Sequence, residues 1–165
     1  MLLTGVGGGT IRDLLLDAPV FWLRDAWIAP TILATSLAAW FAPQRLWPAQ
    51  LLEWADAAGL ATFTVLGTAK ALAFGVAPVP AAILGIVTGC AGGIIRDIVA
   101  GVPSIIMRPD LYVTAAALSA ALATIMVALG SSPALTWSVA ALAGFALRGA
   151  ALVWNIKLPG YSRGN

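Results

Sequence analysis

The sequence contains no histidine and only one cysteine, Cys90, among its 165 residues. An internal disulfide bond is therefore excluded, and the commonest side-chain ligand of transition metals is missing. The glycine-rich runs are not nucleotide-binding fingerprints, because no strand pattern precedes them and no Gly-Lys-Ser/Thr sequence follows them. Nothing pairs a nucleophile with a base either, so we do not expect an enzyme.

Charge is scarce as well. Charged residues make up 10% of the chain and hydrophobic residues 61%, whereas a soluble domain has about 25% charged residues. The stretches 71–95 and 111–147 contain no charge, and such lengths suit helices that cross a hydrocarbon core about 30 Å thick. These features predict an all-α, polytopic membrane protein. The net charge of +2 gives no reason to expect a nucleic-acid partner.

One stretch of the chain occurs twice. Residues 4–24 (TGVGGGTIRDLLLDAPVFWLR) and 88–108 (TGCAGGIIRDIVAGVPSIIMR) share nine of 21 residues at a separation of 84 positions. Each copy places a glycine run before an Arg-Asp pair, Arg12-Asp13 or Arg96-Asp97. A glycine costs a helix about 1 kcal/mol relative to alanine, and charges inside an apolar segment are costly too. Because the chain has both destabilising features, the glycine run and the charged pair, in each copy, we place the candidate functional site here.

The hydrophobic pattern predicts spans over 26–42, 51–75, 111–129 and 135–154, and two helices broken at Gly5–Gly9 and Gly89–Gly93. Counting the predicted spans from one glycine run to the next gives three membrane crossings. An odd number of crossings reverses the direction of the chain, so the two copies are antiparallel, as in an inverted-topology repeat. We expect a single transmembrane domain: residues 1–48 form the remainder of repeat 1, 49–130 form repeat 2, and 131–157 form a final span. The first span of repeat 1 is absent from this sequence, and a late start is favoured over a truncated protein.

Loop charges indicate an orientation. Arg45, Arg108, Lys157 and Arg163 fall on one side and Arg24 on the other. By the positive-inside rule, the side with four basic residues and the C-terminus are expected in the cytoplasm.

A broken helix in a membrane leaves backbone groups that must face protein or water. The freed carbonyls, with the hydroxyls of Thr4 and Thr88, would suit a monovalent cation, whereas the N-termini of the resumed half-helices would suit an anion or a carboxylate. The plainer alternative is that the glycines let two helices cross closely. The candidate pore or ion-binding residues are Thr4, Gly5, Gly7, Gly8, Gly9, Thr88, Gly89, Gly92, Gly93 and Lys70.

The charged residues within the apolar segments have different expected roles. The pairs Arg12-Asp13 and Arg96-Asp97 are expected to brace the helix breaks, either within each copy or with Arg12 bound to Asp97. Lys70 has no acidic residue one helical turn away, so it should face a cavity, a partner span or the interface. We favour a pore-facing or gating role for it. Asp56 is expected to be solvated at the interface.

The motifs TGxGGGxxRD and TGxxGGxxRD, joined by residues 56–72 (DAAGLATFTVLGTAKAL), resemble a known family. They are similar to bacterial small inner-membrane proteins with glycine-transporter domains, whose relatives include the TRIC trimeric intracellular cation channels. The resemblance implies two inverted three-span repeats plus a seventh span, a homotrimer, and an hourglass pore within each subunit. It also implies that kinked second and fifth spans line the pore at Gly5–Gly9 and Gly89–Gly93, and that the fourth span supplies Lys70. Ala91 replaces Gly7 in the second copy, so the two kinks need not be identical.

The leading prediction is a passive channel for monovalent cations, K⁺ first, in the bacterial inner membrane. Its partners would be the lipid bilayer and two further copies of the chain. We expect no cofactor and no metal beyond a permeant K⁺ or Na⁺ in the pore. Two alternatives stay open: a secondary transporter of glycine or another small zwitterion, and a structural membrane subunit whose glycines only pack helices.

Overall fold

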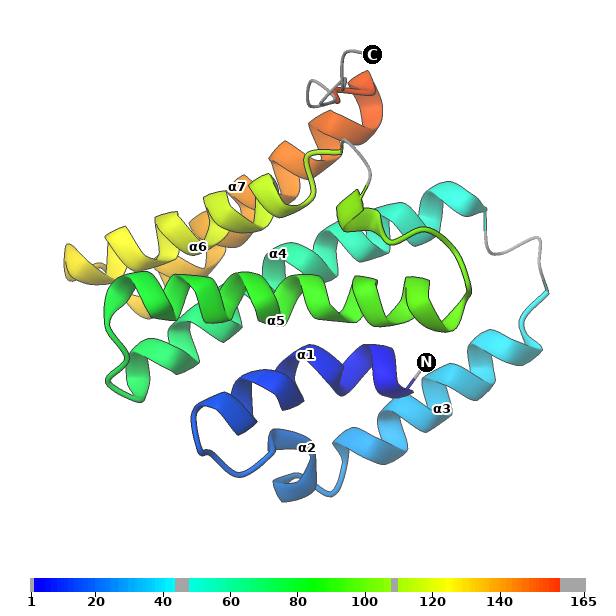
Figure 1. Ribbon diagram of the computed structural model, residues 1–165, viewed down its shortest axis with the longest axis horizontal. Helices are drawn as coiled ribbons and strands as arrows, with labels where there is room; N and C mark the ends of the chain where they lie inside the picture. Colours follow the sequence, from blue (N-terminus) through cyan, green and yellow to red (C-terminus); the bar gives the residue numbers. More distant parts are fainter. Residues whose placement is uncertain (1, 44–47, 108–109, 158–165) are drawn as a thin grey trace, which may run out of the picture.

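The computed structural model describes residues 2–43, 48–107 and 110–157 (Figure 1). Within these ranges the regular elements are helices, and no named strand is present, which confirms the predicted all-α class. The elements are α1 (Leu2–Leu15), α2 (Phe21–Arg24), α3 (Ile28–Phe41), α4 (Ala49–Ala73), α5 (Pro78–Val99), the 3-10 turn η2 (Ile105–Met107), α6 (Val113–Ala128) and α7 (Pro133–Trp154). Arg45, Arg108 and Arg163, on which the expected orientation depends, lie outside the described residues.

Among the described residues, five helix ends contain a residue in the left-handed conformation: Asp17, Gly75, Gly101, Gly130 and Asn155. At such an end the next backbone N–H can reach back to a carbonyl of the last turn. Ala18 N donates to Asp13 O at 2.9 Å, and Val102 N donates to Asp97 O at 3.0 Å. These bonds are 84 positions apart, so the sequence repeat extends to the way in which α1 and α5 end.

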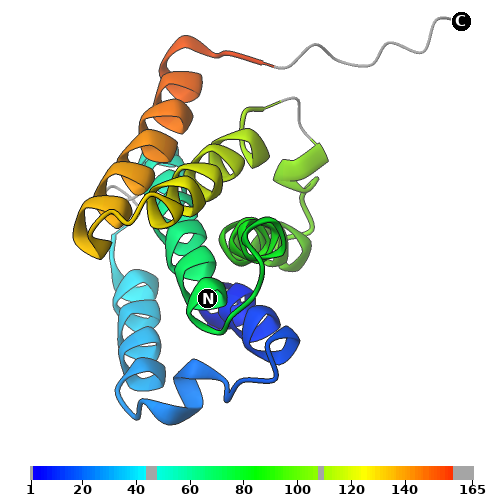
Figure 2. The same cartoon turned by 90° about the vertical axis from the view of Figure 1, so that its left-hand side faces the viewer.

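The helices form a bundle around α4 and α5. Figure 1 shows α1 and α5 side by side and running in opposite directions, with α4 next to α5. The hairpin of α6 and α7 packs against α4, and α6 also contacts α5. The main contact of helix α3 is with α1. Helix α3 has no buried residue, and it stands apart from the bundle in Figure 2.

The glycine runs do not break their helices. Helix α1 is continuous through Gly5–Gly9, and α5 is continuous through Gly89–Gly93, so the predicted breaks are wrong. Glycine lowers helix stability but keeps its backbone N–H and C=O, and a helix that satisfies these groups avoids a penalty of several kcal/mol per group in an apolar setting.

The missing side chains instead allow α1 and α5 to cross closely. A Cβ atom on Gly8 would overlap the carbonyl oxygen of Thr88, and one on Gly92 would lie 2.9 Å from the carbonyl oxygen of Thr4. A shift of 84 positions exchanges the two contacts, so the crossing has two-fold pseudo-symmetry. Close crossing was the plainer of the two alternatives, and it is what these glycines provide.

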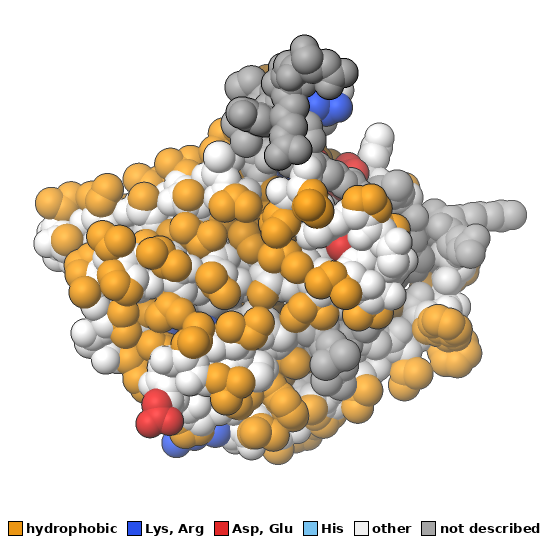
Figure 3. Space-filling model, in the orientation of Figure 1, with side chains coloured by type: hydrophobic (Ala, Val, Ile, Leu, Met, Phe, Trp, Pro, Cys, Tyr) orange, Lys and Arg blue, Asp and Glu red, His pale blue; other side chains and the backbone are white. Residues whose placement is uncertain are grey.

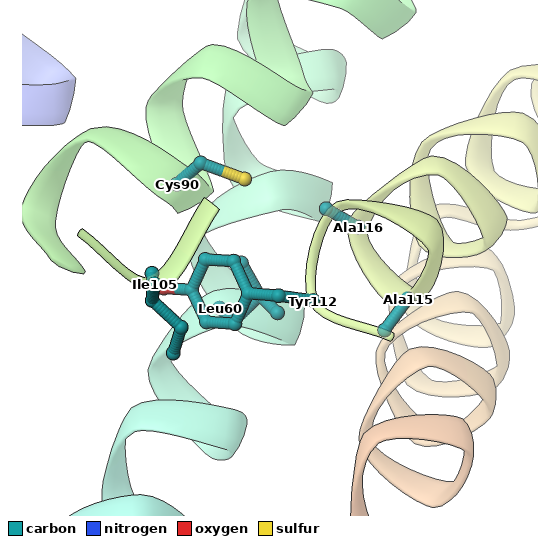
Figure 4. Packing of buried hydrophobic residues seen from close by; sticks show 6 residues of the cluster. All are labelled: Leu60, Cys90, Ile105, Tyr112, Ala115 and Ala116. Atoms are coloured by element: carbon teal, nitrogen blue, oxygen red, sulfur yellow. The ribbon is translucent and has the colours of Figure 1, made fainter. Parts of the chain in front are cut away.

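A buried cluster joins α4, α5, η2 and α6. Its members are Leu60, Cys90, Ile105, Tyr112, Ala115 and Ala116 (Figure 4). Tyr112 belongs to this cluster together with Leu60 and Ile105, and the residue is 1% exposed. Small alanines on the adjoining face of α6 bring that helix close to α5. The cluster therefore holds the connection after α5 against the bundle.

Apolar side chains cover much of the outer surface (Figure 3). Of the described helices, α5 and α7 are long and apolar enough to cross a membrane, judged by length and composition. Helices α3 and α6 are apolar but have 14 and 16 residues. At 1.5 Å per residue they are about 21 and 24 Å long, shorter than a hydrocarbon core of about 30 Å.

The crossing yields a stability prediction. Gly8→Ala places a methyl group against the Thr88 carbonyl, and overpacking of this kind costs about 1–3 kcal/mol. Gly5→Ala is the matched control on the same helix, because its Cβ would meet only Ile32 at 3.8 Å. We expect the apparent melting temperature in detergent to fall for Gly8→Ala and to stay equal or rise for Gly5→Ala. Equal melting of the two variants would contradict the assigned crossing.

Candidate functional site

The carboxylate of Asp13 is the centre of a buried charge cluster at the end of α1. Arg12 Nε and Lys70 Nζ both donate to Asp13 Oδ1 at 2.8 Å. Phe21 N donates to Asp13 Oδ2 at 2.9 Å. The Asp13 side chain is 0% exposed, so each of its oxygens is bound by protein donors. The carboxylate thereby ties α1 to the following connection and to α4.

The same arrangement recurs at the end of α5 with one difference. Arg96 Nε donates to Asp97 Oδ1 at 3.1 Å, and Ile105 N donates to Asp97 Oδ2 at 2.7 Å. The third partner binds Arg96 rather than the carboxylate, because an Arg96 guanidinium nitrogen lies 2.7 Å from Asp56 Oδ1. The ion pairs form within each copy, and the alternative pairing of Arg12 with Asp97 is not made.

Helix α4 supplies the outer partner of both clusters. Lys70 comes from the last turn of α4 and Asp56 from its first half. Lys70 therefore has an acidic partner on another helix, 57 residues away in the chain. The interfacial solvation expected for Asp56 is wrong, since its side chain is 15% exposed and paired with Arg96. Spacing along one helix could not reveal either contact.

Three cavities lie in series along these helices. The Arg12 cavity, about 430 Å³, is lined by Arg12, Phe21 and Lys70 among others. The central cavity is the smallest, at about 190 Å³. The Arg96 cavity, about 480 Å³, is lined by Arg96, Asp97 and Ile105 among others.

Shared lining residues show that the three cavities adjoin one another. Phe63 and Thr88 line both the Arg12 cavity and the central cavity. Asp56 lines both the central cavity and the Arg96 cavity. The two larger cavities lie at the equivalent ends of α1 and α5, and the smallest one lies at the crossing between them.

Most of the candidate residues meet at the central cavity. Its lining includes Thr4, Gly5, Gly8, Thr88, Gly89, Gly92 and Gly93. Gly9 and Lys70 line the Arg12 cavity instead. Gly7 differs from both groups, because a Cβ there would meet the side chain of Ile95.

The central cavity also has lining residues that the sequence did not single out as site residues. Gly59 and Phe63 reach it from α4, and Tyr112 reaches it from the start of α6. Gly59 and Phe63 belong to a series of residues at four-residue spacing in α4, which places them on one face of that helix. No comparable pattern marks Tyr112, whose position depends on the packing of α6 against α5.

Continuous helices change the oxygen chemistry expected of the site. The Thr88 hydroxyl donates to Leu84 O at 2.6 Å, so its proton is already engaged within α5. Backbone carbonyls inside α1 and α5 accept helix hydrogen bonds and are not freed by a break. The N-termini of resumed half-helices, which a carrier for a carboxylate would use, are likewise not formed at the glycine runs.

Comparison with known proteins places this arrangement among membrane proteins. Residues 2–44 and 53–128 match the family model described as glycine transporter, and each matched stretch includes one copy of the repeat. The inner membrane protein YadS of Escherichia coli K12, a UPF0126 protein, is 36% identical over 98% of this chain and 80% of its own length. A UPF0126 membrane protein of Vibrio cholerae is 35% identical over 96% of this chain and 68% of its own.

Solved structures show the same fold. A crystal structure of the TRIC trimeric intracellular cation channel orthologue from Rhodobacter sphaeroides aligns with a TM-score of 0.84 and 39% identity, covering 93% of this chain and 80% of that chain. A second TRIC cation channel aligns with a TM-score of 0.82 and 28% identity, covering 97% of this chain and 80% of that chain.

The Asp13 cluster predicts a large effect of a small change. Asp13→Asn leaves Arg12 and Lys70 without their shared carboxylate, and breaking a buried ion pair costs about 3–5 kcal/mol. Asp17→Asn is the control, because Asp17 is exposed and asparagine tolerates its left-handed conformation. We expect a much lower melting temperature in detergent for Asp13→Asn alone. Similar melting of the two variants would refute a bracing role for Asp13.

Proposed function

This chain belongs to the family of the UPF0126 membrane proteins and the TRIC cation channels, and we propose that it is a passive channel for monovalent cations. K⁺ is the first candidate ion, and conduction takes place through an hourglass pore within each subunit of a homotrimer. The protein acts in the inner membrane of a bacterium, with its C-terminus in the cytoplasm.

The wide–narrow–wide series of cavities is the observation that supports the pore best. The Arg12, central and Arg96 cavities have volumes of about 430, 190 and 480 Å³. They follow one another through shared residues, and the constriction coincides with the glycine crossing of α1 and α5. A series of adjoining cavities supports a path for passive conduction, whereas a carrier needs a binding site that opens to one side of the membrane at a time.

The lining of the central cavity favours a monovalent ion. It combines the hydroxyl-bearing residues Thr4 and Thr88 with glycine backbone and a single carboxylate, Asp56. Divalent cations such as Ca²⁺ take six to eight oxygen ligands, with several carboxylates among them. Asp56 is already paired with Arg96. Such a lining offers weak oxygen contacts, which let an ion enter and also leave.

Planar-bilayer recording tests the proposal directly. Purified protein should give unitary currents whose reversal potential follows the K⁺ gradient, and its mass in detergent should correspond to three copies. Proteoliposomes loaded with glycine provide the contrasting measurement. Saturable glycine counterflow without unitary currents would refute the channel and support the alternative, a secondary transporter of glycine.

The pore path predicts the effect of one added side chain. Gly59 lines the central cavity, and a Cβ there would meet only its neighbour Phe63, at 3.8 Å. Gly59→Leu should therefore assemble normally while its side chain fills the constriction, so that K⁺ conductance falls tenfold or more. Ala58→Leu is the matched control, since Ala58 is exposed next to it on α4. Unchanged conductance in folded Gly59→Leu would exclude the central cavity from the path.

A further inference from the structure

Helix α4 places two opposite charges at the two ends of the cavity series. Asp56 and Lys70 are 14 residues apart, which is close to four helical turns and about 21 Å along the axis. That spacing puts both side chains on nearly the same face of α4. One contacts the end of α5 through Arg96, and the other contacts the end of α1 through Asp13.

The two-fold pseudo-symmetry of α1 and α5 is therefore broken in charge. Arg12 and Lys70 share one carboxylate, Asp13, which leaves one positive charge in excess at the Arg12 cavity. At the Arg96 cavity, Asp56 and Asp97 share one guanidinium, which leaves one negative charge in excess. Glu53, Asp110 and Arg148 also line the Arg96 cavity, and together with Lys157 they line an adjoining cavity. These four charges sum to zero, so the excess of one negative charge at that mouth remains.

We propose that α4 makes the two mouths of the pore electrically unequal, and that Asp56 is the residue that attracts cations and sets the preference for cations over anions. The inference rests on the proposed channel function. Cations gather at the Arg96 cavity before they enter the constriction, whereas the Arg12 cavity repels them. The local K⁺ concentration is therefore higher at the entrance on the Arg96 side than at the entrance on the Arg12 side.

Asp56 holds this role because of its position at the junction of two cavities. Both oxygens of Asp97 are engaged, one by Arg96 and the other by Ile105 N. Asp56 accepts a hydrogen bond from Arg96 through Oδ1. Asp56 lines the central cavity as well as the Arg96 cavity. It is thus the carboxylate closest to the constriction in the lining of these cavities.

The first test uses the wild-type protein. In symmetric 0.1 M KCl, where charges act over about 10 Å, single channels should pass roughly twofold more current when K⁺ enters from the Arg96 side. In 1 M KCl, where the screening length is about 3 Å, the two directions should become equal. A C-terminal tag identifies the side, because Leu152 at the end of α7 lines the Arg96 cavity.

The second test neutralises the carboxylate. Asp56→Asn keeps Arg96 paired with Asp97 at 3.0 Å, and it should lower the K⁺/Cl⁻ permeability ratio by about twofold to fivefold and remove most of the rectification. Asp17→Asn makes the same charge change at an exposed residue outside the three cavities and should leave both quantities unchanged.

The outcomes separate this inference from the function on which it rests. K⁺ currents that are equal in both directions at 0.1 M KCl overturn the inference and leave the channel standing, as does wild-type rectification in folded Asp56→Asn. Absence of K⁺ currents in the wild type overturns the channel and the inference together. If Asp56→Asn does not assemble, the salt dependence of the wild-type currents decides alone.

Discussion

The close crossing of α1 and α5 is the contact on which the rest of the structure depends. Gly8 and Gly92 bring each helix against a backbone carbonyl of the other, at Thr88 and Thr4. Backbones at that distance leave no room for side chains between them, and the smallest of the three cavities lies there. The connections after both helices, and the cavities at their ends, are positioned by this one approach. Glycine therefore serves here as a spacer between helices, and each helix keeps its own hydrogen bonds.

The ends of the crossing helices are held by buried carboxylates. Asp13 and Asp97 each accept a backbone N–H from the connection eight residues on, at Phe21 and Ile105. A buried carboxylate is tolerable only when its charge is compensated and its oxygens are hydrogen-bonded. The adjacent arginine meets that need in both copies. The third member differs, because Lys70 of α4 binds Asp13 whereas Asp56 of α4 binds Arg96.

The repeat and its departures from symmetry have separate consequences. What is shared, the glycine crossing and the carboxylate-bound connections, builds a scaffold with two equivalent ends. What is not shared comes from α4, which binds Asp13 with a lysine and Arg96 with an aspartate. In the proposed pore, the scaffold defines the path, and α4 makes the charge at its two ends different. Two tandem copies of one motif can in this way form a site whose two sides are chemically distinct.

The sequence by itself determined the all-α class and the membrane character, because these follow from composition and hydrophobic run length. The motif kept twice also marked many of the residues that line the central cavity. The sequence also placed most helices within a few residues, since apolar runs end at prolines, glycines and charged residues. It did not determine whether the glycines would break the helices or let them cross. Low helix propensity is a local property of about 1 kcal/mol per residue, and a neighbouring helix that fills the gap outweighs it.

Only the tertiary structure decided the partners of the charged side chains. Lys70 meets Asp13 across 57 residues of chain, and Asp56 meets Arg96 across 40. No spacing rule along one helix predicts such pairs, because they depend on how α4 lies against α1 and α5. The same holds for Tyr112, which reaches the central cavity only because the alanine-rich face of α6 packs against the bundle. Periodicity identifies the residues that share a face, and packing determines what that face meets.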